Sequence, residues 1–205
     1  MIKRIGILTS GGDAPGMNAC IRSVVRAAYK KKIYVTGIEY GFKGLLNSKF
    51  INLSPESVTN IVHKGGTILK TNRCEEFKQK KYRKVAYNNL IKENIDGLII
   101  LGGDGSFKGA SIFSKEYKIP IIGIPSTIDN DIYGTDYSIG FNTAVQTIMD
   151  SVDKIRDTAS SHERIFFIEV MGRNSGHLSI HAGNATGAEL IMIPEIKIKN
   201  LDFLV

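Results

Sequence analysis

Cysteine, tryptophan and long apolar runs are scarce or missing in this sequence. Only 2 of its 205 residues are cysteine, and Cys20 and Cys74 form no Cys-x-x-Cys pair, which excludes a disulfide scaffold and suits a reducing compartment. No run approaches the roughly 18 apolar residues of a membrane helix. The amino-terminal apolar stretch, residues 5–8, is shorter than the roughly 7–15 residues of a secretory signal. We therefore predict a soluble, cytoplasmic protein with no membrane partner.

Positive charge is concentrated in the first part of the chain. Residues 1–84 hold 17 basic and 5 acidic residues, a net charge of +12, whereas residues 85–205 carry −5. Such a distribution suggests a polyanionic partner, either nucleic acid or a phosphorylated small molecule. Single-strand binding surfaces interleave aromatic with basic residues, but the basic run 78–84 holds one aromatic residue. We interpret that run as a solvated helix face and predict no nucleic-acid partner.

Short apolar runs alternate with segments of helical spacing. The expected strands are residues 5–9, 33–38, 98–101, 119–124 and 165–170. The expected helices lie around residues 21–28, from Ser54, over 83–94, around 110–113 and over 142–158. Strands that are apolar throughout are typical of parallel sheets buried on both faces. The pattern predicts a doubly wound α/β fold, in which ligands bind at the carboxyl ends of the strands.

Two Gly-Gly-Asp loops follow expected strands, at residues 11–13 and 102–104. Glycine lets the backbone approach a phosphate closely, and the next helix offers free N–H groups. An aspartate beside such a loop suits Mg²⁺ bound to the phosphates. The sequence has neither the P-loop pattern G-x-x-x-x-G-K-[ST] nor the dinucleotide pattern G-x-G-x-x-G. Two ordinary tight turns are the alternative interpretation.

The segment from Thr127 to Asp131 carries two carboxylates and a hydroxyl. Residues two apart in an extended segment point the same way, so Thr127, Asp129 and Asp131 are expected on one face. That set suits a general base and its positioning partner. A polar turn that satisfies its own backbone is the alternative.

Three arginines lie at expected loop positions, Arg73, Arg164 and Arg173. Arginine binds phosphate bidentately and can neutralise charge on a transferring phosphoryl group. Surface ion pairs are the alternative for each.

Two further pairs have helical spacing. His177 and His181 are four residues apart, but Leu178 stands where a metalloprotease motif requires glutamate, so we interpret them as structural. Arg22 and Arg26, also four apart, would ordinarily form a solvated face.

Several ordered motifs together resemble the bacterial ATP-dependent 6-phosphofructokinases. The motifs are Ile5–Asn18, Gly65–Thr67, Leu101–Ser106, Pro125–Asp131, Gly134–Phe141, Asp157–Arg164 and Glu169–Arg173. The resemblance covers the amino-terminal portion of the family, whose members continue well beyond Val205. It implies two Rossmann-like domains of doubly wound, mostly parallel sheets, the second incomplete. Residues 1–139 would form the ATP-binding domain without its carboxyl-terminal return segment, and residues 140–205 the start of the fructose 6-phosphate domain.

The resemblance also implies the reaction and the residues that perform it. The γ-phosphoryl group of Mg-ATP would pass to the 1-hydroxyl of fructose 6-phosphate in a homotetramer regulated by ADP and phosphoenolpyruvate. The implied catalytic residues are Asp129 as the base, Thr127, Arg73 and Arg173. Those implied to bind ATP are Gly12, Arg73, Cys74, Gly102, Gly103, Asp104, Gly105 and Ser106, with Asp104 as the Mg²⁺ ligand. The implied sugar-phosphate ligands are Thr127, Ile128, Asp129, Arg164 (from a neighbouring subunit), Met171, Gly172 and Arg173. Those implied for the effector site are Arg22, Arg26, Arg156, Gly187, Ala188 and Glu189, which replaces the solvated-face interpretation of the first two.

Two positions distinguish the phosphoryl donor. Pyrophosphate-using relatives carry a bulkier acidic residue where Gly105 stands and lysine where Ser126 stands. An aspartate at position 105 would occupy and repel the α-phosphate, so Gly105 favours ATP. The alternatives are a pyrophosphate-dependent phosphofructokinase, a kinase of NAD or lipid, and an inactive or regulatory nucleotide-binding fragment.

Overall fold

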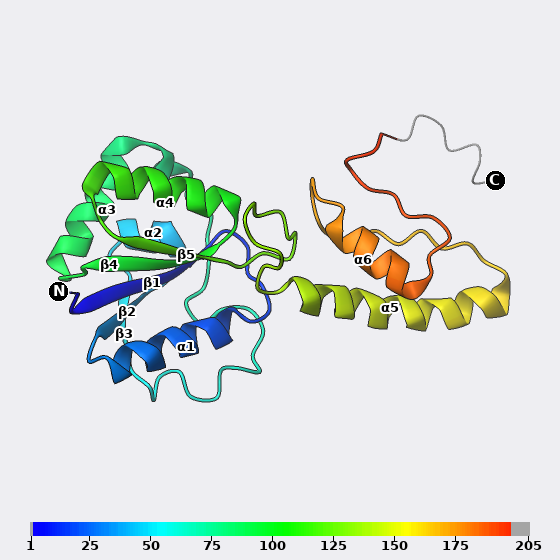
Figure 1. Cartoon of the computed structure of the whole chain (residues 1–205), viewed down its shortest axis with the longest axis horizontal. Helices are drawn as coiled ribbons and strands as arrows, with labels where there is room; N and C mark the ends of the chain where they lie inside the picture. Colours follow the sequence, from blue (N-terminus) through cyan, green and yellow to red (C-terminus); the bar gives the residue numbers. More distant parts are fainter. Residues whose placement is uncertain (1, 198–205) are drawn as a thin grey trace. The chain divides into compact units, whose positions relative to one another are not determined.

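The computed structural model describes residues 2–197, and its contacts divide the chain into two compact units (Figure 1). Unit 1 is Met1–Thr127 and unit 2 is Ile128–Val205. Residue 1 and residues 198–205, which end the predicted second domain, lie outside the described residues. This division falls before the predicted boundary at 139/140, and the assignment of the two domains stays a prediction.

Unit 1 alternates strands and helices along the chain. Its strands are β1 (Arg4–Ser10), β2 (Tyr34–Ile38), β3 (Phe50–Leu53), β4 (Gly97–Gly102) and β5 (Ile121–Pro125). Its helices are α1 (Met17–Lys30), α2 (Gly41–Leu46), the 3-10 helix η1 (Glu75–Lys78), α3 (Lys80–Lys92) and α4 (Asp104–Tyr117). The sequence did not predict α2, β3 or η1. Each is only four to six residues long and lacks the continuous apolar run that predicted β4 and β5.

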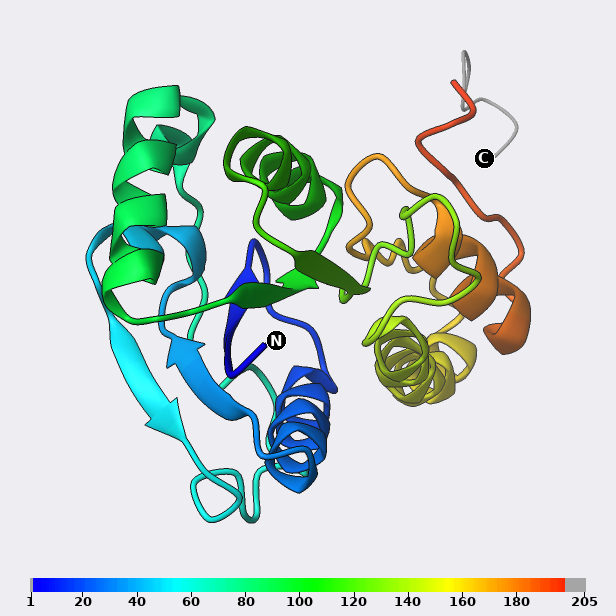
Figure 2. The ribbon, with the colours of Figure 1, turned by 60° about the vertical axis from the view of Figure 1, so that its left-hand side comes forward.

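The strands form one sheet in the order β3-β2-β1-β4-β5 (Figure 2). β1 pairs in parallel with β2 and β4, and β4 pairs in parallel with β5. Only the β2–β3 pairing is antiparallel within this sheet. The predicted α/β fold with a mostly parallel sheet is therefore confirmed.

Helices cover both faces of the sheet in unit 1. α1 lies on one face and buries Met17, Ile21 and Val25 (Figure 1). On the other face α3 and α4 contribute Leu90 and Phe113 to the main apolar cluster. The apolar residues of these helices recur at the spacing of one helical face, which is why the sequence predicted them.

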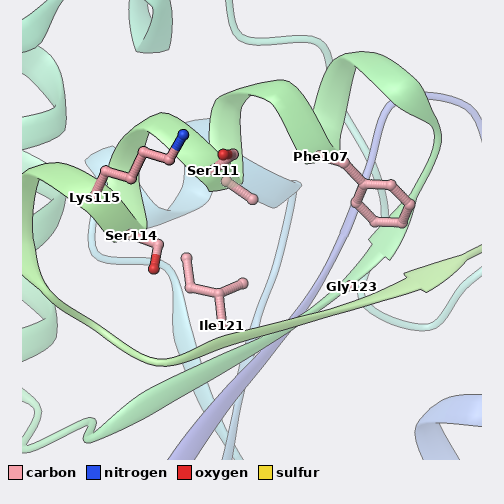
Figure 3. Close-up of a pocket in the computed structure, with 7 residues that line it drawn as sticks. Phe107, Ser111, Ser114, Lys115, Ile121 and Gly123 are labelled. Atoms are coloured by element: carbon pink, nitrogen blue, oxygen red, sulfur yellow. The ribbon is translucent and has the colours of Figure 1, made fainter.

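β5 corrects the prediction that every apolar strand is buried on both faces. Ile122 is 64% exposed, because β5 is an edge strand of the described sheet. An open groove runs between α4 and β5, with Ser111, Lys115 and Ile121 along it (Figure 3).

The helix predicted from Ser54 is not formed. Residues 55–60 make turns, and Asn60 has a φ of 56°. The Ser57 hydroxyl donates to the Ser54 carbonyl (2.8 Å) and accepts the Ser54 N–H (2.9 Å). These local bonds compete with helical ones, and the left-handed residue ends the segment after one turn.

Unit 2 consists, within residues 128–197, of α5 (Phe141–His162), α6 (His177–Thr186) and loops. The strand predicted over residues 165–170 is absent there, and Ile165 and Phe167 are 79% and 73% exposed. A strand needs a neighbour to accept its hydrogen bonds, and the described part of unit 2 offers none. Although α5 has 22 residues, no helix of the described chain is long and apolar enough to cross a membrane.

Candidate active site

The two Gly-Gly-Asp loops lie side by side at the carboxyl end of the sheet. β1 and β4 are adjacent, and Ser10 is in register with Gly102. The Ser106 hydroxyl donates to the Ser10 carbonyl (3.0 Å), which ties the start of α4 to the end of β1. A Cβ on Gly102 would come within 2.6 Å of that same carbonyl oxygen, so this position requires glycine.

At Gly12 and Gly105, unlike at Gly102, the packing of the protein does not require glycine. A Cβ on either residue would meet nothing within 4 Å. Both lie beside the free space at the ends of β1 and β4 rather than inside the protein. Their lack of a side chain therefore leaves room for a ligand rather than for a neighbouring residue.

The first turn of α4 is suited to an anion. Its N-cap residue, Gly103, has no side chain to cap the N–H groups of that turn. Asp104 is the first helical residue, and its exposed carboxylate pairs with the Lys108 ammonium at 2.6 Å. Thr127 lies next to this turn, 3.7 Å from the position of a Cβ on Gly103. Mg²⁺ is typically held by one or two carboxylates and by phosphate oxygens, so a single exposed aspartate here fits that ion.

A buried amide holds the segment before Arg73 against α1. Asn18 is 1% exposed, and its Nδ2 donates to the carbonyls of Lys64 (3.0 Å) and Gly65 (3.3 Å). Its Oδ1 accepts the N–H of Ile68 at 2.7 Å. The sequence interpretation missed this residue, although a polar side chain at helical spacing from Ile21 was a detectable signal.

Two threonines continue this attachment toward the first glycine loop. The Thr9 hydroxyl donates to the Lys70 carbonyl (2.7 Å), and the Thr71 hydroxyl donates to the Gly11 carbonyl (2.9 Å). The structure thus places exposed Arg73 and half-buried Cys74 just after a segment bonded to the loop that contains Gly12. Burial raises the pKa of the Cys74 thiol above its ordinary value. Neither threonine was singled out from the sequence, because their bonds join residues about sixty positions apart.

In unit 2, Asp129 lies beside Asp131 and Arg173. Burial raises the pKa of the Asp129 carboxyl above its ordinary value, the negative charge of Asp131 raises it further, and Arg173 partly offsets both. The Ser175 hydroxyl donates to the Asp129 carbonyl at 2.8 Å, joining this loop to the turn that carries Arg173. A carboxyl whose proton is held more tightly than usual, close to a positive charge, is suited to acid–base work.

The turn around Arg173 has a constrained backbone. Gly172 has a φ of 135°, and a Cβ there would come within 2.4 Å of the Ser175 carbonyl oxygen. Arg173 itself has a φ of 55° and an exposed side chain. Met171 and Arg164 are also exposed, in unit 2, while Ile128 is half-buried. The turn thus needs glycine at position 172 and presents Arg173 outward.

The residues implied for an effector site divide between the units. In unit 2 the Arg156 guanidinium donates to the Thr186 carbonyl. A Cβ added to Gly187 would lie 3.6 Å from Nη1 of the same guanidinium. Ala188 and Glu189 follow as exposed residues. In unit 1, half-buried Arg22 and exposed Arg26 share one face of α1.

The histidines pack against an aromatic ring. The rings of His177 and His181 lie 6.4 Å and 5.1 Å from the Phe141 ring, edge to face. Within the described residues no group of three or more metal-binding side chains occurs.

The comparisons with known proteins agree on one family. The family model described as Phosphofructokinase matches residues 4–204. The ATP-dependent 6-phosphofructokinase of Persephonella marina is 58% identical over 95% of this chain and 60% of its own length. The chain therefore spans about three fifths of the length of the curated relatives that it matches.

Solved structures extend the match to the fold. Phosphofructokinase from Saccharomyces cerevisiae superposes with a TM-score of 0.93 at 38% identity, over 98% of this chain and 30% of that one. A pyrophosphate-dependent phosphofructokinase from Marinobacter aquaeolei gives 0.85 at 26% identity, over 99% of this chain and 56% of that one. With its strand-end glycine loops and a family match over nearly its whole length, the chain belongs to the phosphofructokinase family.

Proposed function

We propose that the protein transfers the γ-phosphoryl group of ATP to the 1-hydroxyl of fructose 6-phosphate, yielding fructose 1,6-bisphosphate and ADP. Family membership supports this, as does the name ATP-dependent 6-phosphofructokinase of relatives at 57–58% identity. The observation that carries the proposal is Asp129, a partly buried carboxyl with a raised pKa beside Arg173. It is the best-placed proton acceptor for the sugar hydroxyl.

Unit 1 would bind the nucleotide. The open space at Gly12 and Gly105 admits phosphates, and the first turn of α4 offers them N–H groups and a positive dipole end. The other residues that we propose to bind ATP are Arg73, Cys74, Gly102, Gly103, Asp104 and Ser106. Asp104 would hold Mg²⁺, which, when bound, supplies positive charge that neutralises the phosphate oxygens.

The chain's own groups would account for most of the chemistry. Asp129 takes the proton of the sugar hydroxyl, and Thr127 helps to position the sugar. Arg73 and Arg173 stabilise the negative charge on the phosphoryl group as it moves. Phosphoryl transfer depends mainly on such positioning and electrostatic stabilisation.

Unit 2 would bind the sugar phosphate through the loops beside Asp129. The further ligands in this proposal are Ile128, Arg164 from a neighbouring subunit, Met171 and Gly172. A homotetramer regulated by ADP and phosphoenolpyruvate belongs to the same proposal. Its effector residues are Arg22, Arg26, Arg156, Gly187, Ala188 and Glu189. A cytoplasmic location likewise stays a prediction.

A second donor deserves a direct test, because a pyrophosphate-dependent phosphofructokinase also matches this fold. The room at Gly105 favours ATP, since that space is free for the α-phosphate that pyrophosphate lacks.

Purified protein should form fructose 1,6-bisphosphate from Mg-ATP and fructose 6-phosphate in a coupled assay. Asp129→Asn should lower kcat by about 10²–10⁴-fold, the usual contribution of a general base. The control Asp153→Asn removes an exposed carboxylate from α5 in the same unit and should leave kcat unchanged. ATP binding without turnover would support a regulatory nucleotide-binding protein instead.

A further inference from the structure

The segment that carries Arg73 and Cys74 leads directly into η1. Its beginning is bonded to the β1 loop through the Thr71 hydroxyl and the Gly11 carbonyl. Its end has no strand or long helix of its own, because η1 is a single four-residue turn. Through Gln79 the chain continues directly into α3, and side chains of α3 and α4 contact η1.

Arg83 of α3 holds the backbone at the end of η1. Its Nη1 donates to the carbonyls of Phe77 (2.9 Å) and Lys78 (2.6 Å). Its Nε and Nη2 each donate to a carboxylate oxygen of Glu116, both at 2.7 Å, in the last turn of α4. Arg83 is 6% exposed, although the sequence placed it in a solvated basic run.

The side chain of Phe77 is held from the same direction. Its ring stacks on Phe42 with centroids 4.1 Å apart and tilts against Phe113 of α4 at 5.4 Å. Gly109 of α4 faces the Phe77 ring, where an added Cβ would lie at 3.6 Å. η1 is thus fixed to α4 by its backbone through Arg83 and by its side chain through Phe77.

α4 connects this anchor to the phosphate-binding turn. The helix runs unbroken from Asp104 to Tyr117, so Glu116 and the Gly103–Ser106 turn belong to one rigid element. Any shift of η1 against α4 moves Arg73 and Cys74 relative to that turn. The Arg83–Glu116 ion pair is only partly buried, since Arg83 is buried and Glu116 is not, and desolvation of the arginine offsets part of the attraction. We therefore look for the effect of the Arg83–Glu116 pair in the position of η1 relative to α4 rather than in stability.

We propose that Arg83 is a positioning residue for nucleotide binding, fixing Arg73 and Cys74 relative to the first turn of α4 through its bonds to η1 and Glu116. The inference rests on the proposed binding of ATP by unit 1. In this proposal Arg83 acts through the backbone of η1 rather than by touching the nucleotide. Its loss should weaken ATP binding more than fructose 6-phosphate binding.

Arg83→Lys tests this directly, since lysine keeps the charge but not the planar set of donors. Calorimetry with Mg-ATP should show a dissociation constant raised about tenfold, as expected for a lost charge-assisted hydrogen bond. The KM for ATP should rise in parallel, while the KM for fructose 6-phosphate stays within about twofold. Glu116→Gln keeps the arginine bonds to η1 and should raise the ATP dissociation constant by a smaller factor, about threefold.

Asp96→Asn is the matched control for stability. The Asp96 carboxylate accepts the N–H groups of Lys3 (2.6 Å) and Arg4 (2.9 Å) at the amino end of the sheet. The control should lower the urea midpoint without changing ATP affinity. The inference is overturned if Arg83→Lys loses stability but binds ATP as the wild type does. If Arg83→Lys does not fold, Glu116→Gln decides by the same criterion. Wild-type protein that binds no ATP would overturn the proposed function and this inference together.

Discussion

Asp129 illustrates how one residue can oppose stability and serve function. Its pKa is raised, first by burial and then by Asp131, so the folded protein binds this proton more tightly than the unfolded chain does. Stability therefore falls as pH rises from the ordinary carboxyl value through the raised native one. Above that window the partly buried, ionised carboxylate is a constant cost to the folded state.

The expected consequence is that Asp129→Asn is more stable than the wild type at pH 7. The gain should shrink as pH falls toward 4, because a carboxyl with a raised pKa regains its proton earlier in that descent than an ordinary one does. Urea denaturation at both pH values measures it, with Asp153→Asn as the control for loss of an exposed carboxylate. Equal gains at pH 4 and 7 would contradict the assignment of the effect to Asp129 ionisation.

Gly105 allows a second test at the residue scale. Because an added Cβ there meets nothing within 4 Å, Gly105→Asp should fold with stability within about 1 kcal/mol of the wild type. The new carboxylate would stand in the space proposed for the α-phosphate, so ATP affinity should fall about 100-fold.

Gly105→Asn is the matched control for charge, since it adds the same volume without the negative charge. It should weaken ATP binding less than Gly105→Asp does. Equal losses would mean that bulk alone matters at this position, and no loss in either variant would contradict the proposed location of the α-phosphate.

At the scale of elements, the attachment of the loop 64–68 to α1 depends on Asn18. Asn18→Ala leaves the Lys64 and Gly65 carbonyls and the Ile68 N–H without this partner. The free energy of unfolding should fall by about 1–3 kcal/mol, because the variant loses three hydrogen bonds made by a buried side chain. ATP affinity should fall too, because Arg73 follows this loop.

Asn89→Ala provides the matched control. Asn89 is a buried asparagine of α3 whose Nδ2 donates to the Leu45 (2.9 Å) and Leu46 (3.0 Å) carbonyls. It should lose similar stability while keeping ATP affinity. If both variants bind ATP equally well, the loop attachment matters for folding only.

Elements also show where sequence patterns were insufficient. The period of apolar residues predicted α1, α3, α4 and α5. The first three bury several residues on one face, whereas Phe141 is the one buried residue of α5. The segment after Ser54 carried a good helix start, yet Ser57 bonds locally and Asn60 adopts a left-handed conformation. The run 165–170 has strand composition, but the described part of unit 2 offers no strand to pair with it.

For the whole molecule, the proposed function assigns one ligand to each unit. Mg-ATP at 100 times its dissociation constant should stabilise the unit that binds it by about 2.7 kcal/mol. Hydrogen exchange followed by mass spectrometry should then show stronger protection in peptides of β1, α1, β4 and α4. Fructose 6-phosphate should instead protect residues 128–131 and 171–175.

ADP at the same excess is a useful comparison in that experiment, because it keeps the α- and β-phosphates. Because ADP is also the proposed effector, it should protect residues 187–189 as well. Absence of ADP protection in β4 and α4 would contradict the assignment of the nucleotide to unit 1.

The sequence by itself determined the class of fold and the positions of the glycine loops. Apolar runs and helical periods are local properties, so β1, β4 and the loops after them could be predicted without knowledge of the packing. The family motifs added candidate roles for Asp129 and Asp104. The sequence also placed Asp104 and Asp129 near strand ends, where α/β proteins with parallel sheets bind their ligands.

Only the tertiary structure decided which of these residues meet. Ser106 bonds to Ser10 across 96 positions, and Arg83 reaches Glu116 across 33. Neither contact has a local signature, because a side chain's partner depends on strand order and helix packing rather than on its neighbours in the chain. For the same reason Arg83 looked solvated in the sequence and is buried in the fold, while Ile122 looked buried and lies exposed on an edge strand.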